Sequence, residues 1–409
     1  MPRAGRVAIG FSNVSHTLTH MFMLLYPTAV LGLEAEFGLP YGELLALSLA
    51  GFILFGVGAL PAGWLADRWS ETGVFTAMLL GMGTGGVLTS FATTPFTVAA
   101  GLAVIGLFAS IYHPVGIAMV VRHAAKRGRA LGVNGVFGGV GLASGPLIAG
   151  VLMDVGSWRM AFLIPGIITF ALGIAFWITA RAVKLHTIRE DAAPEPEVSS
   201  RVMVSAFVTL AVATMCAGLI FQCFSVVLPK LFALRLDFFE PGSGSEIGGL
   251  VALVFLVAAC FQIVGGLAAD RYPLKWVYVI AWTVQIPVVL WAATAAGLPL
   301  VVAASAIILL LNGSAPAESA LFAKYSPARW RATAFGVKFV IALGVSALGV
   351  PLVAHIYDTT GAFYWLFIVL AGLAIVIALV ALLLPSETKQ TAPLPEGASG
   401  KQQPVGAAD

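Results

Sequence analysis

The stretch GWLADRW (Gly63–Trp69) decides the fold, because a close copy, GLAADRY (Gly266–Tyr272), recurs half a chain later. Each stretch follows a long apolar run, and each keeps a glycine, an aspartate and an arginine at the same spacing. The aspartates, Asp67 and Asp270, lie 203 residues apart in a chain of 409 residues. A motif that recurs at half the chain length predicts that the protein consists of two copies of one unit.

The composition indicates that this chain lies in a lipid bilayer. Hydrophobic residues make up 59% of the sequence, charged residues only 10%, and the mean hydropathy is +0.98. A soluble domain carries about 25% charged residues, and a water-soluble fold of this composition exposes large apolar patches that aggregate. The formal net charge is only +3, and no basic tail is present, so nucleic acid is not an expected partner.

Twelve apolar runs reach the length of about 20 residues that a membrane-spanning helix needs. The predicted spans are 7–33, 43–65, 73–92, 95–121, 130–153, 159–181, 202–231, 246–268, 275–296, 299–323, 332–356 and 362–384. An even number of spans separates the matching markers, so both copies have the same orientation. We therefore predict an all-α polytopic membrane protein in which twelve transmembrane helices form two parallel repeats of six.

The same reading predicts the boundaries of the units and their orientation. The expected units are an N-terminal six-helix bundle (1–181), a cytoplasmic linker (182–200), a C-terminal six-helix bundle (201–385) and a disordered cytoplasmic tail (386–409). Eighteen of the 22 Lys and Arg residues fall on the side of the membrane that holds both termini. Because cytoplasmic loops carry the excess of positive charge, we expect cytoplasmic termini in a plasma membrane of the bacterial inner-membrane type.

The repeated loop resembles the hallmark cytoplasmic loop motif of the major facilitator superfamily. Its residues are Gly63, Asp67 and Arg68 in the first copy, and Gly266, Asp270 and Arg271 in the second. The first copy departs from the motif because Glu71 and Thr72 stand where a last basic residue is usual. The resemblance covers about residues 7–384. It implies the major facilitator fold, transport by alternating access, and a gating role for both loops.

A second motif lies in the predicted span 130–153. Gly141, Gly145 and Pro146 resemble the Gly-Pro motif that the superfamily's proton-coupled exporters carry. The alternative is that these small residues only permit close packing between helices. The stretches SHTLTH (15–20) and YHPVG (112–116) also resemble the fosmidomycin-resistance branch of bacterial exporters. That branch is expected to have acidic residues where His20 and Val115 stand, so its coupling residues are not carried over.

A few polar side chains interrupt the predicted spans. Such groups cost several kcal/mol at bilayer depth and tend to mark a transport pathway. The candidates for the substrate and proton cavity are His16, His20, His113, Asn134, Gln222, Glu318 and Lys338. The resemblance implies that the first, fourth, seventh and tenth spans line this cavity. The alternatives are hydrogen bonds between helices for His16 and His20, capping of backbone carbonyls freed by Pro114 for His113, and a purely structural ion pair for Glu318.

These observations favour a secondary active transporter that exports a small organic solute by proton antiport. The alternative is proton-linked uptake of a small organic anion, with Lys338 and the histidines supplying positive charge. A membrane sensor that transports nothing is a third possibility. The GxSxG, HExxH and GxxxxGKS motifs are absent from the sequence, so we expect no enzyme activity. We expect no metal and no cofactor, and we expect a monomer whose partners are its substrate, protons and the lipid bilayer.

Overall fold

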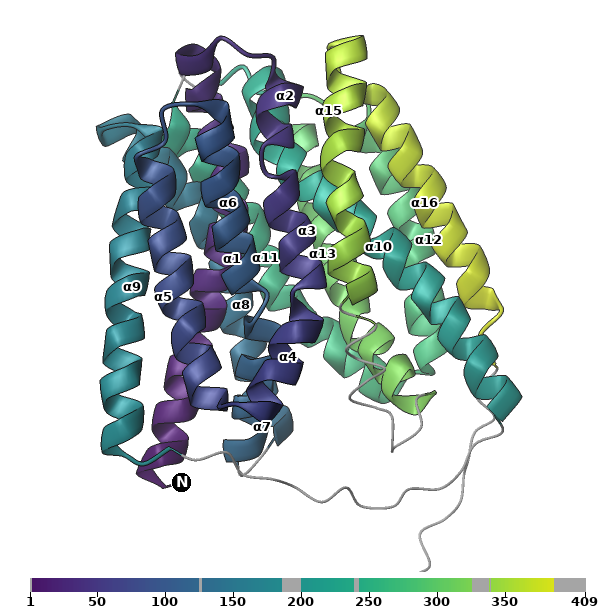
Figure 1. The fold of residues 1–409 in the computed structure, drawn as a ribbon. Coiled ribbons are helices and arrows are strands. Elements are labelled where there is room, and N and C mark those ends of the chain that lie inside the picture. The colour runs from purple at the N-terminus through teal and green to yellow at the C-terminus, as the bar shows by residue number, and fades with distance from the viewer. Residues whose placement is uncertain are drawn as a thin grey trace, which may run out of the picture.

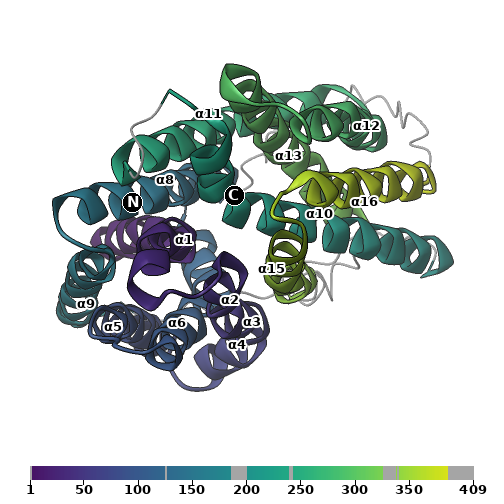
Figure 2. The ribbon, with the colours of Figure 1, turned by 90° about the horizontal axis from the view of Figure 1, so that it is seen from above.

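The computed structural model describes residues 2–124, 127–185, 200–238, 243–325, 338 and 340–385. Most of the predicted linker 182–200 and all of the predicted tail 386–409 therefore lie outside the described residues. Two groups of helices stand side by side, one from each half of the chain (Figure 1). Figure 2 shows that the groups meet along α1, α8 and α11 and along α2, α3 and α15.

The described elements are all helical. The N-terminal half contains α1 (Arg3–Phe37), α2 (Tyr41–Ala46), α3 (Leu49–Val57), α4 (Ala59–Arg68), α5 (Glu71–Ser90), α6 (Pro95–Ala109), η1 (Tyr112–Gly116), α7 (Ile117–His123), α8 (Arg127–Val155) and α9 (Trp158–Ala182). The C-terminal half contains α10 (Ser200–Arg235), α11 (Gly244–Arg271), α12 (Leu274–Ala292), α13 (Gly297–Lys324), η3 (Val340–Gly344), η4 (Val345–Leu348), α15 (Gly349–Thr360) and α16 (Tyr364–Leu382).

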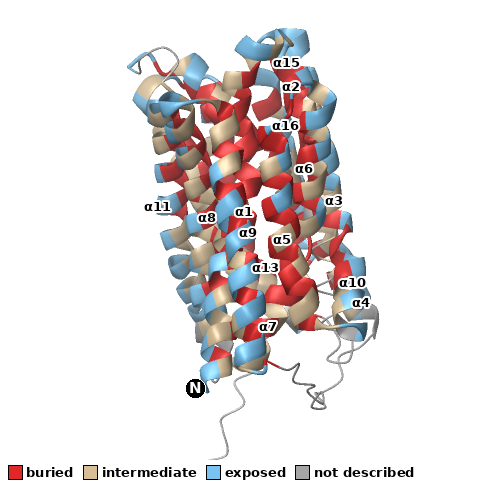
Figure 3. Ribbon diagram, turned by 60° about the vertical axis from the view of Figure 1, so that its left-hand side comes forward, coloured by how far each residue is buried: buried red, intermediate tan, exposed pale blue. Residues whose placement is uncertain are grey.

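The number of membrane-spanning helices agrees with the sequence. Among the described residues, eleven spans are long and apolar enough to cross a bilayer. A twelfth is present if the pair Tyr41–Val57 and Ala59–Ala66, bent by 41°, counts as one span. Many large apolar side chains are exposed, and Figure 3 shows in pale blue that exposed residues lie along the outer faces of the helices. Lipid is the solvent in which such a surface is stable, because an exposed apolar surface of this size aggregates in water.

Three predicted spans are interrupted within the membrane. The predicted span 43–65 is divided into α2, α3 and α4, and a turn of π-helix, η1, divides the predicted span 95–121. Pro114 lies inside η1 and has no backbone N–H to donate to the preceding turn. The described part of the predicted span 332–356 begins with the π-helical η3 and the 3₁₀-helical η4. Single π-helical turns widen a helix locally and are frequent at functional sites.

Glycines bring α8 into backbone contact with α1. A Cβ atom on Gly145 would lie 2.7 Å from the backbone oxygen of Met21, and a Cβ atom on Gly141 would collide with the backbone oxygen of Thr17. One turn further on, a Cβ on Gly138 would lie 2.6 Å from the ring of His16. The absence of side chains at these three positions therefore sets the distance between the two helices.

Carboxylates join the two halves at the end of the bundle opposite the N-terminus. Asp154, near the end of α8, accepts hydrogen bonds from the backbone N–H groups of Gly244 (2.9 Å) and Ser245 (2.8 Å) at the start of α11. Asp358, near the end of α15, accepts one from the N–H of Gly42 (3.0 Å) in α2. Each half thus caps a helix of the other with an aspartate, where the helix dipole favours negative charge.

An ion pair strengthens the same end. Lys230 of α10 contacts the carboxylate of Glu34 in α1 at 2.7 Å. The hydroxyl of Tyr41 donates to the backbone oxygen of Val226 at 3.2 Å. In Figure 1, α2 and α15 meet at the top while the N-terminus lies at the bottom. These contacts close the far end, which we define as the end of the bundle opposite the N-terminus.

The glycine contact predicts a site-specific loss of stability. We expect Gly141→Ala to lower the free energy of unfolding by about 1–3 kcal/mol, because the added methyl group overpacks the α1–α8 interface. Gly10→Ala is the matched control, since nothing lies within 4 Å of a Cβ at that exposed helical position. It should be neutral or stabilising by up to about 1 kcal/mol. Unfolding of both purified variants in detergent measures the difference, and equal stabilities would contradict the packing role.

The carboxylate caps predict how the protein divides between states with the far end closed and states with the far end open. Replacing both Asp154 and Asp358 with alanine should open the far end, because an exposed carboxylate at a helix N-terminus contributes about 0.3–1 kcal/mol. Spin labels on the α5–α6 and α12–α13 connections should report a larger population at long distances. Glu36→Ala is the control, since Glu36 bonds Trp158 and Arg159 of its own half at the same end. An unchanged distance distribution in the double variant would show that the two aspartate caps, which act as latches between the halves, do not hold the far end closed.

Candidate functional site

A cavity of about 190 Å³ lies between the two halves. One wall is formed by α1, α3 and α8, and the other by α10, α12, α13, η3 and η4. Much of the lining is apolar and includes Met23, Phe52, Phe55, Phe221 and Trp282. Among the described lining residues, the ionisable ones are His20 on the first wall and Glu318 on the second. The cavity therefore combines an apolar surface with one ionisable group from each half.

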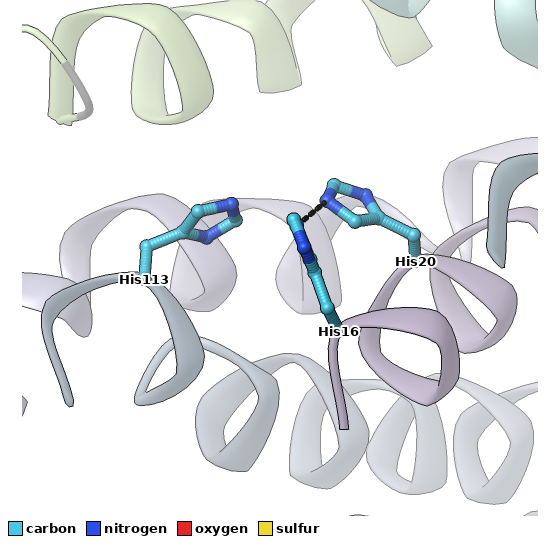
Figure 4. Close-up of side chains that lie close together, drawn as sticks. All are labelled: His16, His20 and His113. Carbon is cyan, nitrogen blue, oxygen red and sulfur yellow. Dashed lines mark hydrogen bonds between the residues drawn. The ribbon is translucent and has the colours of Figure 1, made fainter. Parts of the chain in front are cut away.

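Three histidines form a cluster beside this cavity, and Figure 4 shows their side chains close together. His16 and His20 lie one turn apart on α1, and His113 lies in η1. The Nε2 atoms of His16 and His20 are 3.1 Å apart. One ring nitrogen from each of the three histidines lies within 4.8 Å of the others. The structure thus brings His113 to two candidates that lie almost 100 residues earlier in the sequence.

A backbone hydrogen bond sets the orientation of the His16 ring. Its Nδ1 atom lies 2.8 Å from the backbone oxygen of Asn134. A carbonyl oxygen only accepts, so Nδ1 is the donor. In the neutral ring, Nε2 then carries the lone pair and accepts a hydrogen bond from Nε2–H of His20. The ring of His16 is therefore held with its acceptor atom directed into the cluster.

A buried polar network stands behind the histidines. The side-chain amide of Asn134 donates to Oδ1 of Asn13 at 2.9 Å and to the hydroxyl of Tyr112 at 2.7 Å. The Tyr112 ring stacks on His16, with 4.5 Å between the ring centroids. Ser12 donates to the backbone of η1 at 2.8 Å. The network fixes α1, η1 and α8 relative to one another, so the cluster is supported from three elements.

An ion pair occupies the opposite side of the cavity. Nζ of Lys338 lies 3.0 Å from the carboxylate of Glu318, and each of the two side chains is only 11% exposed. The hydroxyl of Tyr278 donates to the other carboxylate oxygen at 2.9 Å. Lys338 also donates to the hydroxyl of Ser319 at 3.2 Å and lies 5.1 Å from the ring centroid of Phe322. Several partners thus compensate the buried charges, as an ion pair at low dielectric requires.

The remaining candidates occupy different places. Gln222 lines the cavity, whereas Asn134 lies behind His16. Pro146 faces the second half, because its backbone oxygen would collide with a Cβ on Gly248 of α11. Lys338 is held against Glu318 beside the cavity.

The two loop motifs lie at the end of the bundle that holds the N-terminus. The Asp67 side chain lies outside the described part of the structure. Arg68 is exposed, with its guanidinium 4.5 Å from the ring centroid of Trp64. Asp270 and Arg271 are exposed at the end of α11. The gating role of these loops stays a prediction.

Three features of the site were not identified from the sequence. Tyr112 and Tyr278 contact the histidine cluster and Glu318, respectively. The third feature is an ion pair of 2.7 Å between buried Glu71 and partly exposed Arg122, which ties the start of α5 to the end of α7. A tyrosine hydroxyl inside a membrane span needs a partner, and that rule identifies both tyrosines as candidates.

The chain is similar to several drug-resistance proteins. It is 31% identical over 116 residues to puromycin resistance protein pur8 of Streptomyces alboniger, covering 28% of this chain and 22% of that protein. It is 26% identical over 158 residues to a multidrug resistance protein B homolog of Mycobacterium tuberculosis, covering 38% and 29%. It is 25% identical over 250 residues to the class H tetracycline resistance protein of Pasteurella multocida, covering 60% and 61%. The matched region spans less than two thirds of each relative.

Solved transporter structures share the fold. A bacterial homolog of the human lysosomal transporter Spinster, inward-facing and occupied, superposes with a TM-score of 0.73 at 14% identity, covering 94% of this chain and 95% of that one. A POT family transporter in complex with a thioalcohol-conjugated peptide gives a TM-score of 0.73 at 15% identity, covering 92% and 95%. At these identities, the likeness concerns the fold alone.

Matches to a family model over most of the chain identify its family. The family model of the Major Facilitator Superfamily matches residues 14–240 and again residues 210–407. The model thus matches each half of the chain once, as expected for two copies of one unit. The duplicated loops and the capping aspartates Asp154 and Asp358 also occur once in each half. Members of this family transport solutes and are not enzymes, and the predicted all-α fold of two repeats is confirmed. This chain belongs to the major facilitator superfamily of membrane transporters.

Proposed function

We propose that this protein exports a small amphiphilic organic solute in exchange for protons. The observation that carries the proposal is the cavity between the halves, in which a carboxylate, Glu318, faces an otherwise largely apolar lining. The similarity to puromycin, tetracycline and multidrug resistance proteins supports export. In this proposal both termini are cytoplasmic, the membrane is a bacterial inner membrane, and the protein acts as a monomer.

Glu318 is the proposed coupling group. A proton on its carboxylate removes the attraction to Lys338 and the negative charge beside the cavity. When Glu318 is protonated, its contacts with Tyr278 and Lys338 must rearrange. His20 faces the same cavity from the other half. Because a charge buried without a partner is costly, protonation changes the relative free energies of the inward-open and outward-open states. The proton thereby biases the alternating-access equilibrium.

The cavity lining supports the proposed class of cargo. Aromatic rings and methionine provide apolar contacts, while Gln222 and Thr214 provide hydrogen bonds. Such a surface suits a solute with an apolar body and a few polar groups. The paired loops Gly63–Arg68 and Gly266–Arg271 are the proposed gates at the cytoplasmic end.

Proton-linked uptake of an organic anion is the alternative. It requires a cation that reaches the solute, and Lys338 and the histidines are the candidates. Lys338 is already engaged by Glu318 and Ser319, and it does not line the cavity. Lys338 therefore does not supply this cation, and His20 is the cavity-lining candidate that anion uptake would need. The third possibility, a sensor that transports nothing, predicts no flux in the assay below.

The coupling role of Glu318 is tested by proton flux. The protein is reconstituted into liposomes that contain a pH-sensitive dye, and amphiphilic drugs and organic anions are added in turn. The direction of compound-dependent proton movement distinguishes antiport from symport. We expect Glu318→Gln to abolish gradient-driven flux and to retain exchange of labelled cargo, because the amide cannot take up a proton but still fits the site.

Glu43→Gln is the matched control for this assay. Glu43 is an exposed carboxylate in α2, so its loss should leave gradient-driven flux unchanged. Wild-type flux in Glu318→Gln would remove Glu318 from the coupling role. The absence of flux with every compound would leave the sensor as the better explanation.

The ion pair also predicts a pattern of stabilities. Lys338→Met leaves the Glu318 carboxylate without its cation and should lower the free energy of unfolding by about 3–5 kcal/mol. Combining it with Glu318→Gln should recover most of this loss, because no charge is then left unpaired. Unfolding curves of the single and double variants in detergent measure the coupling. Additive losses would show that the two side chains do not stabilise each other.

A further inference from the structure

The histidine cluster has the composition of a metal site. His16, His20 and His113 each offer one ring nitrogen within 4.8 Å of the others. We infer that these three histidines bind a divalent transition-metal ion of the Zn²⁺ class, with one coordination position directed to the central cavity. This inference does not depend on the proposed direction of transport or on its coupling to protons.

The spacing of the nitrogen atoms fits such an ion. Zinc binds histidine nitrogen at about 2.0–2.1 Å in tetrahedral geometry, which places two ligand nitrogens about 3.3 Å apart. The Nε2 atoms of His16 and His20 are already 3.1 Å apart. The three ligand nitrogens lie within 4.8 Å of one another, so His113 must approach the other two by about 1.5 Å or less for all three to bind one ion.

The hydrogen bond at Nδ1 of His16 orients this ring as a metal ligand. Its Nδ1–H donates to the backbone oxygen of Asn134, an outer contact that metal-binding histidines typically make. This bond fixes the tautomer that leaves the lone pair on Nε2. When an ion binds, the proton on Nε2 of His20 moves to its Nδ1 atom, and both Nε2 lone pairs then point at the ion. The hydrogen bond between the two rings is replaced by two metal–nitrogen bonds.

The ligand type indicates which ions the cluster binds, and the position of His20 indicates how an ion reaches it. Neutral imidazoles suit zinc, copper, nickel and cobalt, whereas Mg²⁺ and Ca²⁺ prefer oxygen ligands. His16 and His20, four residues apart, project from one face of α1. His20 lines the cavity, so the ion has a route to the site, and water or a solute in the cavity can occupy the fourth position. Three histidines with one open position make a site from which an ion exchanges.

Metal binding is tested on the purified full-length chain without an affinity tag, in detergent and without a proton gradient. Co²⁺ is the probe, because its visible absorption reports four-coordinate nitrogen ligation, and Zn²⁺ is the competitor. We expect one Co²⁺ per chain, displaced by Zn²⁺. His20→Gln and His113→Gln should each weaken binding at least tenfold. Zn²⁺ should also raise the melting temperature of the wild type and not that of His113→Gln.

His123→Gln and His355→Gln are matched controls, because both residues lie outside the cluster. The former is bonded to the backbone of α7 and the latter is exposed on α15. Both variants should bind Co²⁺ as the wild type does. The inference is overturned if the wild type binds no Co²⁺, or if binding survives in both His20→Gln and His113→Gln. His16→Gln is a poorer test, because His16 also contacts Asn134 and Tyr112 in the network that joins α1, η1 and α8.

Discussion

The close approach of α1 and α8 is the constraint on which the site depends. Without side chains at Gly138, Gly141 and Gly145, the backbone of α8 lies directly against α1. This contact allows the backbone oxygen of Asn134 to reach His16, and it places the side-chain amide of Asn134 between Asn13 and Tyr112. A methyl group added at the interface would separate the helices and move every one of these partners. The glycines of the α8 motif, Gly141 and Gly145, therefore have a definite local effect in this chain: they let α8 approach α1 closely enough for Asn134 to hold the ring of His16.

The two walls of the cavity stabilise their buried polar groups in different ways. On the N-terminal side, the polar groups are imidazoles held by neutral donors and acceptors. On the C-terminal side, opposite charges, Glu318 and Lys338, compensate each other and are supported by Tyr278 and Ser319. A neutral cluster can gain a cation without breaking an ion pair, whereas a salt bridge responds to a proton by losing an attraction. The two halves, although copies of one unit, thus present different chemistry to the same solute.

The sequence predicted the architecture because apolar length and repeated markers are local features of the chain. It also identified all three histidines and Glu318, because ionisable residues in apolar runs are few. It did not predict that α2, α3 and α4 divide one span, since this bend depends on packing: a Cβ on Gly58 would lie 2.5 Å from the hydroxyl oxygen of Ser110, which belongs to the predicted span 95–121. Nor did it predict the partners Tyr112 and Tyr278, because the distance between elements far apart in the chain is decided only by the packing of the helices.

The caps at the far end have a consequence for how this transporter tolerates sequence change. In each cap, the acceptor is an aspartate side chain and the donors are backbone amides. Every residue except proline supplies such an amide, so the donor at Ser245 survives most replacements there. Gly42 is different, because a Cβ at that position would collide with the carboxylate of Asp358. The cap at α11 therefore has one donor, Ser245, whose side chain can change. Its other donor, Gly244, is restricted like Gly42, because a Cβ there would lie 3.0 Å from the carboxylate of Asp154.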